Sequence, residues 1–244
     1  MTYLKTFFGH DIDYNHAVQI FGIHHFYTIC VALFAIFGTL RFANTIKEKI
    51  NENKLKYSLA ALLITLEVTY HLHNWSYPRV SLPLHICSFA TILNITLLLT
   101  DNKRIFNYAF FFGILGGFMA LFIPFSYGYT YFNFRYYHFM LMHFLIMAVP
   151  LYYYKALHYR VTYKTLIDVY KIIIVVAIMI YLINIPLQTN YWFISTIPPE
   201  VQTIFPNWPI YITTFMALVF STMNLLYYLS HKKFDHCEEI EKVV

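Results

Sequence analysis

Seven long apolar runs, each nearly free of charged residues, limit the folds that this sequence can adopt. A bilayer core holds no water to satisfy backbone polar groups, so such runs span membranes as α-helices. Only 12% of the residues are charged, against about 25% in a soluble domain. We therefore expect an all-α, polytopic membrane protein, with predicted spans at 23–40, 57–73, 83–100, 105–126, 136–154, 169–187 and 209–229.

These spans divide the chain into three predicted regions. In residues 1–22 apolar and polar residues alternate, which is typical of an extracytoplasmic amphipathic segment lying at the membrane interface. Residues 23–230 form the seven-helix transmembrane domain, and 231–244 form a cytoplasmic tail. Three glycines in the fourth predicted span, within 113–117, indicate close contact between helices.

The basic residues of the loops predict the orientation. Alternate loops of a seven-span protein lie on opposite sides of the membrane, and 14 Lys and Arg residues then fall on one side. The other side holds only Lys5, Arg79 and Arg135. Because an excess of Lys and Arg marks the cytoplasmic side, we expect an outer N-terminus and a cytoplasmic C-terminus. The protein is then a multi-pass component of a cell membrane, predicted to be a bacterial plasma membrane. The basic residues follow the loops, so nucleic acid is not an expected partner.

Residues 67–87 gather more reactive side chains than any other stretch. They include an acid, three histidines, an arginine and a thiol: Glu67, His71, His73, Arg79, His85 and Cys87. Glu67 is the only acid within a predicted span. Because a charge in hydrocarbon costs about 2.5–3.5 kcal/mol, such groups usually face the bundle interior and mark function. With the predicted topology, these groups form an outward-facing polar site with His138 and His143 of the fifth span.

Helix geometry predicts which groups meet. Glu67 and His71 are four residues apart, on one helix face, and can form a hydrogen bond. His85 and Cys87 are two apart, about 200° around a regular helix, so a base for the thiol must come from another helix. His143, His138 and His71 are the candidates. Cys87 also has a simpler interpretation as a small buried apolar residue.

From Ser81 to Ser88, Ser-Leu-Pro-Leu-His-Ile-Cys-Ser, the chain resembles the YwaF-like bacterial integral-membrane family, which is similar to the animal transmembrane protein 164 acyltransferases. Glu67, the glycine-rich 113–117 and His143, seven residues before a proline, add to the resemblance. It implies a seven-span fold and acyl transfer between phospholipids through a cysteine thioester assisted by histidine. In the animal members the nucleophilic cysteine directly precedes the histidine of Pro-x-His. Leu84 stands there in this chain, and the nearest thiol is Cys87.

On this basis we expect Cys87 as nucleophile, His143 as base and His85 as oxyanion donor or second histidine. Glu67 and His71 complete the expected acid–base groups. The residues expected to bind the membrane phospholipid are His138, Arg79, Arg135 and Asn94.

Other functions remain open at this stage. Lipid hydrolysis is possible in place of acyl transfer. No metal or cofactor is expected for the thioester reaction, but a zinc hydrolase is an alternative, with His71, His85 and His143 as ligands and Glu67 as general base. A non-enzymatic transporter or receptor is a further alternative, because buried acids and histidines also serve as proton relays. The lipid bilayer is the expected surrounding, and the oligomeric state is not predicted.

Overall fold

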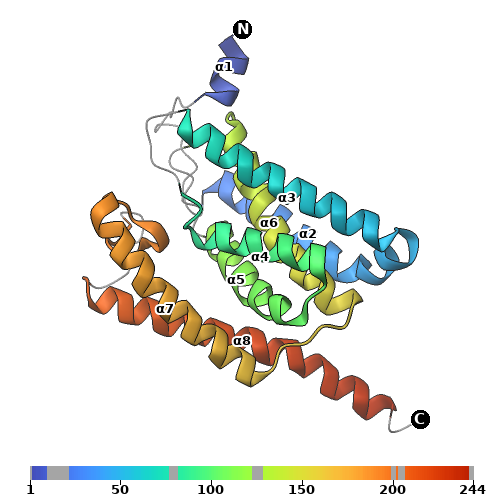
Figure 1. The fold of residues 1–244 in the computed structure, drawn as a ribbon. Helices are drawn as coiled ribbons and strands as arrows, with labels where there is room; N and C mark the ends of the chain where they lie inside the picture. The colour runs from blue at the N-terminus through green and yellow to red at the C-terminus, as the bar shows by residue number, and fades with distance from the viewer. Residues whose placement is uncertain are drawn as a thin grey trace. The chain divides into compact units, whose positions relative to one another are not determined.

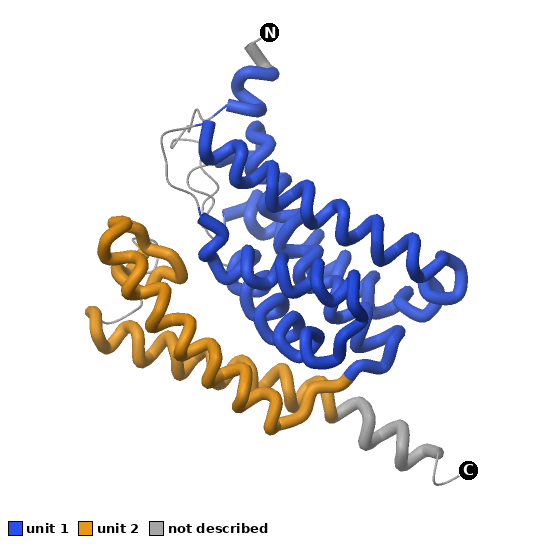
Figure 2. Tube along the Cα trace, viewed as in Figure 1, with its two compact units in different colours: residues 1–159 blue, residues 160–244 orange. Residues whose placement is uncertain are grey.

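A computed structural model describes residues 2–9, 22–76, 82–122, 129–198, 202 and 207–241. These residues form helices and connecting turns without any strand, which confirms the all-α prediction (Figure 1). The chain divides into two compact units, residues 1–159 and 160–244 (Figure 2). The helices are α1 (Thr2–Phe8), α2 (Ile23–Lys49), α3 (Glu52–Trp75), α4 (Ile86–Thr100), α5 (Lys103–Phe122), α6 (Phe134–Ala156), α7 (Tyr163–Leu187) and α8 (Ile210–Glu241), with a 3-10 turn η1 (Tyr191–Phe193).

Five of these helices, α2, α5, α6, α7 and α8, are long and apolar enough to cross a membrane. The chain is therefore a multi-pass membrane protein. The other two long elements differ from these five for separate reasons. The apolar α4 has only 15 residues, about 22 Å at 1.5 Å per residue, and α3 carries charged residues at its beginning. The count of seven spans stays a prediction.

Unit 1 is built around α4, α5 and α6, which pack against one another; α3 lies on α4, and α2 lies on α6. Two glycines let α5 approach α6 closely, as predicted. A Cβ on Gly113 would lie 2.3 Å from the Ile146 carbonyl oxygen, and one on Gly117 would lie 2.3 Å from Met147 Cγ and 2.8 Å from the His143 carbonyl oxygen. The backbone of α6 that carries His143 is thus in direct contact with α5.

Helix α4 begins three residues later than the sequence predicted. We expected it to start at Pro83, but the Leu84 N–H donates to the Leu82 carbonyl at 2.7 Å, which closes a turn before the helix. His85 has extended backbone angles, φ −70° and ψ 151°, and is the N-cap. The first bond of the α4 ladder runs from the Phe89 N–H to the His85 carbonyl. Cys87 is consequently the second residue of α4.

The predicted interfacial segment is helical where it is described. In α1 the Thr6 carbonyl accepts a hydrogen bond from Asn133 Nδ2 at 3.1 Å. The rings of Phe7 and Phe8 lie 6.3 and 5.5 Å from that of Phe134 at the start of α6. Residues 10–21 lie outside the described part of the chain.

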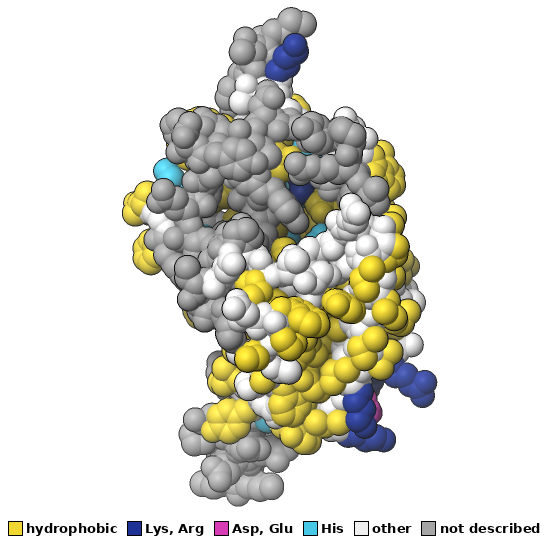
Figure 3. All heavy atoms as spheres, turned by 90° about the vertical axis from the view of Figure 1, so that its left-hand side faces the viewer, with side chains coloured by type: hydrophobic (Ala, Val, Ile, Leu, Met, Phe, Trp, Pro, Cys, Tyr) yellow, Lys and Arg dark blue, Asp and Glu magenta, His cyan; other side chains and the backbone are white. Residues whose placement is uncertain are grey.

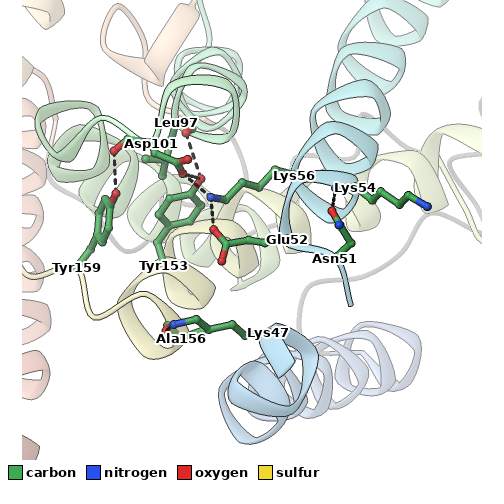
Figure 4. A network of polar contacts seen from close by, with 10 residues as sticks. All are labelled: Lys47, Asn51, Glu52, Lys54, Lys56, Leu97, Asp101, Tyr153, Ala156 and Tyr159. Atoms are coloured by element: carbon green, nitrogen blue, oxygen red, sulfur yellow. Dashed lines mark hydrogen bonds and ion pairs between the residues drawn. The ribbon is translucent and has the colours of Figure 1, made fainter. Parts of the chain in front are cut away.

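A polar network joins the start of α3 to the ends of α4 and α6 (Figure 4). Lys56 Nζ of α3 forms ion pairs with Glu52 and, at 2.7 Å, with Asp101 Oδ1 at the end of α4. The Tyr153 hydroxyl of α6 donates to the same Asp101 oxygen at 2.7 Å. The Tyr159 hydroxyl donates to the Asp101 carbonyl at 2.8 Å. One aspartate therefore links three helices and the segment after α6.

Unit 2 consists of α7, η1 and α8, and α7 packs against both of the others. The buried Asn184 side chain organises the loop that follows α7. Its Oδ1 accepts from the Tyr191 N–H and the Thr189 hydroxyl, and its Nδ2 donates to the Tyr191 carbonyl and to Ser195 Oγ, all at 2.9 or 3.0 Å. The loop is thus tied to the last turns of α7.

Candidate functional site

The end of unit 1 where α3 ends and α4 and α6 begin, called the site end below, holds most of the predicted site residues. On α3, Glu67 Oε1 and His71 Nε2 are 3.1 Å apart, as the four-residue spacing predicts. Their side chains are only 12% and 9% exposed. The His71 ring lies 5.6 Å from that of Trp75. The second oxygen, Glu67 Oε2, is buried and has no hydrogen-bond partner among the described residues.

On α6, His138 is held as a neutral imidazole. Arg135 Nη1 lies 3.1 Å from His138 Nδ1, and a guanidinium can only donate, so Nδ1 is the acceptor. Nε2 then carries the proton and donates to the Leu66 carbonyl at 2.7 Å. With both ring nitrogens engaged, His138 cannot take a proton from another group. The Arg135 guanidinium lies 4.5 Å from the centre of the Tyr70 ring, in a cation–π contact.

One turn further along α6, His143 is arranged differently. Its Nδ1 lies 2.7 Å from the Phe139 carbonyl oxygen, which can only accept, so Nδ1 carries the proton. Its Nε2 therefore has a free lone pair, and it forms no hydrogen bond within the part of the chain that the structure describes. The side chain is buried, and the centre of its ring lies 4.1 Å from that of Phe139, with the two rings tilted by 40°. Of the two α6 histidines, only His143 has a nitrogen available as a base.

Cys87 is a free, partly exposed thiol in the first turn of α4. Backbone N–H groups of Ser88 and of Cys87 itself reach its sulfur as hydrogen-bond donors. The N–H groups of a first helical turn have no intrahelical carbonyl partner, and they favour a negative charge beside them. Cys87 is thus nearer to the helix N-terminus than the predicted start at Pro83 would place it.

Electrostatic interactions connect these groups across the three helices. The Cys87 sulfur interacts with Glu67 of α3 and with Arg135 of α6. His85 interacts with His71, and His143 interacts with His85. Figure 3 shows apolar side chains over much of one face, with a basic side chain and histidine side chains visible among the others. The site end thus gathers a thiol, an acid, an arginine and four histidines.

The family comparison adds an independent observation. The sequence model of the TMEM164 family matches residues 17–227. The chain belongs to the TMEM164 family. The matched region contains α2 to α7, all of the site end and most of α8. No curated protein and no solved structure matches the chain.

One of the residues predicted to bind substrate, Asn94, is part of the helix packing in this TMEM164-family chain. Asn94 is fully buried, and its Nδ2 donates to the Ala90 carbonyl at 2.8 Å and to the Ile146 carbonyl of α6 at 3.2 Å. These contacts join α4 to α6 and leave the amide in the helix packing. Arg79 lies outside the described residues. A substrate-binding role for these two residues stays a prediction.

The zinc alternative has no preformed ligand cluster in the described part of the chain. No three His, Cys, Asp or Glu side chains in that part are grouped to hold a metal ion. The alternative set His71, His85 and His143 is therefore not assembled as a metal centre. The predicted thioester reaction needs no metal ion. Measuring activity with and without a chelator tests whether the protein depends on one.

Sequence reasoning missed two residues that contact the α6 groups of the TMEM164-family site. Tyr70 stacks under the Arg135 guanidinium, and the Thr69 hydroxyl lies 3.3 Å from His138 Nε2. Tyr70 and Thr69 are neighbours of His71 in the sequence, but only the packing of α3 on α6 shows that they face the α6 groups.

Proposed function

We propose that this protein is a membrane acyltransferase that moves acyl chains between phospholipids through a thioester on Cys87, at a site open to the outside of the cell. Membership of the TMEM164 family supports a lipid-modifying role. The observation that carries the proposal is the position of Cys87 in the first turn of α4, with backbone N–H groups directed at its sulfur. First-turn N–H groups that point at the sulfur can stabilise the negative charge that develops there as the thiol loses its proton.

The proposal includes the seven-span topology, with α3 and α4 as the second and third spans. The polar groups of α3 support it, because Lys56, Glu67 and His71 are turned into the bundle and largely hidden from lipid. A helix with buried polar groups can cross a membrane despite a modest overall hydropathy. The excess of Lys and Arg in alternate loops then gives an outer N-terminus and an outer site end.

His143 is the general base of the proposed reaction. Its Nδ1–H is fixed on the Phe139 carbonyl, so Nε2 presents its lone pair. The electrostatic interaction between His143 and His85, two residues before Cys87, supports a position near the thiol. General bases of this kind contribute about 10²–10⁴-fold to the rate.

In the first step His143 Nε2 takes the Cys87 thiol proton, and the sulfur attacks the ester carbonyl of the donor phospholipid. The carbon–sulfur bond forms while the carbon–oxygen bond breaks, and His143 returns the proton to the leaving lysophospholipid oxygen. The products are a Cys87 thioester and a lysophospholipid. In the second step the hydroxyl of an acceptor lysophospholipid attacks the thioester, which releases the thiol. Water in place of the acceptor would give hydrolysis.

The test is reconstitution of the purified protein with acyl-labelled phospholipid and an unlabelled lysophospholipid. We expect label to reach the acceptor and, transiently, Cys87, where hydroxylamine releases it. Cys87→Ala should abolish both signals, and His143→Ala should reduce transfer by about 10²-fold or more. Cys30→Ala, which removes an exposed free thiol on α2, is the matched control and should match wild type.

Two results would overturn the proposal. Full transfer by Cys87→Ala would eliminate the thioester. Release of label that survives Cys87→Ala but stops on addition of a chelator would identify a metal-dependent hydrolase instead.

A further inference from the structure

Arg135 is an isolated cation at the site end. It is the only Lys or Arg between Arg104 and Lys155 in the sequence. It is the second residue of α6, a helix long and apolar enough to cross a membrane, and it is only 5% exposed. A charge buried in such a helix is costly and usually marks a functional group. The sequence predicts that Arg135 binds the phospholipid but does not indicate which part of the lipid it contacts.

Three neutral groups orient the Arg135 guanidinium. Its Nη1 donates to His138 Nδ1 at 3.1 Å, and its central carbon lies 4.5 Å from the centre of the Tyr70 ring and 5.9 Å from that of Tyr129. Tyr70 comes from α3 and Tyr129 from the segment before α6. None of the three groups carries a negative charge, so they fix the direction of the guanidinium without neutralising it. The helix packing thus holds a positive charge in a set position.

This charge lies near the sulfur at which the proposed reaction takes place. Arg135 of α6 interacts electrostatically with Cys87 of α4, and the two helices are in contact. In a phospholipid, only two glycerol carbons and two oxygens separate the phosphorus from the carbonyl carbon of the ester on the central glycerol carbon. A donor lipid whose carbonyl carbon lies at the Cys87 sulfur therefore has its phosphate close to the same thiol, within reach of a neighbouring guanidinium.

The chemistry of arginine matches that of a lipid phosphate. The planar guanidinium presents parallel N–H donors to two phosphate oxygens, is always charged, and is more weakly hydrated than an ammonium group. The acid of the site end, Glu67, has its Oε1 bound to His71, and a carboxylate would repel a phosphate. Among the described residues of the site end, Arg135 is therefore the group best suited to bind this anion.

We propose that Arg135 binds the phosphate of the phospholipid and so positions its ester at Cys87. The inference rests on the proposed thioester function and names the part of the substrate that this site recognises, which is the phosphodiester and not the head group beyond it. The acceptor lysophospholipid carries the same phosphate, so the contact serves both half-reactions alike. Tyr70, Tyr129 and His138 are positioning residues that orient the guanidinium.

The experiment compares two labelled acyl donors in the full-length reconstituted protein: a phospholipid, and the diacylglycerol with the same acyl chains, which lacks the phosphate. The rate of Cys87 acylation is measured in a single turnover. We expect Arg135→Gln to slow acylation by the phospholipid about 10–10²-fold, the effect of losing hydrogen bonds between charged groups. Acylation by diacylglycerol should stay at the wild-type rate. Arg135→Lys keeps the charge but loses the planar fork, and its rate with the phospholipid should fall between the two.

Arg41→Gln is the matched control. Arg41 is exposed on α2 and also lies against an aromatic ring, 5.7 Å from the centre of Phe42, and its variant should keep the wild-type preference for the phospholipid. Equal slowing of both donors by Arg135→Gln would overturn the inference, because Arg135 would then support the fold or the chemistry itself. An unchanged preference for the phospholipid would overturn it as well.

Inorganic phosphate distinguishes a lipid phosphate from a free one. Added to the wild-type protein, it should leave acylation by diacylglycerol unchanged, since the proposed site takes its phosphate as part of the lipid. Inhibition by inorganic phosphate that disappears in Arg135→Gln would identify a site for the free anion and contradict the assignment to the lipid.

A binding measurement tests the phosphate contact apart from the reaction. A dialkyl ether phospholipid has no ester for Cys87 to attack, and a dialkylglycerol lacks the phosphate too. In native mass spectrometry the wild-type protein should bind the ether phospholipid more tightly than the dialkylglycerol, and Arg135→Gln should lose this difference. A difference that survives in Arg135→Gln would rule out the phosphate contact. If the wild-type protein forms no acyl-enzyme, the proposed function fails, while the binding measurement still decides on the phosphate site.

Discussion

Lys56 of α3 and Asp101 at the end of α4 form an ion pair, with 2.7 Å between Nζ and Oδ1 (Figure 4). Lys56 precedes the predicted second span and is 5% exposed. Burial alone would lower its pKa, but its hydrogen bonds to Asp101 and Glu52 outweigh burial and raise the pKa above the ordinary value. Lys56 is therefore charged at neutral pH. Its ion pairs with Asp101 and Glu52 stabilise this end of unit 1.

Asp101→Asn is expected to destabilise unit 1. It removes the charge that faces Lys56 and weakens the hydrogen bond from Tyr153, and Glu52 remains as the only acidic partner in the network. Hydrogen bonds to charged groups contribute about 1.5–3 kcal/mol, so the thermal midpoint in detergent should fall. The control is Asp168→Asn on the exposed face of α7, which should change stability by less than about 0.5 kcal/mol. Equal midpoints for the two variants would show that the ion pair contributes nothing.

Gly117→Ala is expected to disturb the packing of α5 on α6. The new Cβ would lie 2.3 Å from Met147 Cγ and 2.8 Å from the His143 carbonyl oxygen. The methionine can move, but the backbone of α6 cannot, so α5 must shift. Overpacking of this kind costs about 1–3 kcal/mol, and transfer activity should fall because the contact adjoins His143.

The matched control for Gly117→Ala is Gly38→Ala in α2, where a Cβ would meet nothing within 4 Å. Alanine there should stabilise the helix by about 0.5–1 kcal/mol, since glycine is the poorer helix former. Thermal midpoints and transfer rates of both variants check the prediction. If both glycines tolerate alanine equally, the close approach of α5 and α6 is not a constraint on the fold.

The sequence predicted the helices well because apolar runs and their breaks are local features. The pairing of Glu67 with His71 was predictable for the same reason, since it depends on one helix. The start of α4 was not, because Pro83 is compatible both with a first helical turn and with the tight turn that the Leu84 N–H closes. That shift makes Cys87 the second residue of the helix instead of the fifth.

Contacts between side chains of different helices could not be predicted from the sequence. Arg135 and the Leu66 carbonyl bind both ring nitrogens of His138, whereas Nε2 of His143 keeps a free lone pair. The spacing of the two histidines in the sequence does not indicate this difference. Asp101 lies between two predicted spans, and nothing in the sequence indicates that it joins three helices. Such roles depend on which side chains the packing brings together across unrelated parts of the sequence.

Asn184→Ala is expected to loosen the loop after α7. The amide makes four hydrogen bonds, two of them to the backbone of Tyr191, and alanine would leave buried backbone groups without partners. Such groups cost about 1–3 kcal/mol. Limited proteolysis should cut within 188–198 faster in the variant. Asn224→Ala is the control, because Asn224 donates only to the Phe220 carbonyl of its own helix. A loop equally resistant in both variants would contradict the role of Asn184.

The proposed topology predicts which engineered cysteines a membrane-impermeant maleimide can reach. In a background without Cys30, Cys87 and Cys237, a cysteine replacing Phe132, exposed before α6, should react in intact cells or spheroplasts. A cysteine replacing Lys54, exposed near the start of α3, should react only after the membrane is permeabilised. The two positions lie at opposite ends of unit 1, since α3 and α6 contact each other and Lys54 lies at the Lys56–Asp101 end. Labelling of the Lys54 position alone in intact cells would indicate the opposite topology, with the site end on the cytoplasmic side. Labelling of both in intact cells would mean that they share a side, which an odd number of spans between them does not allow.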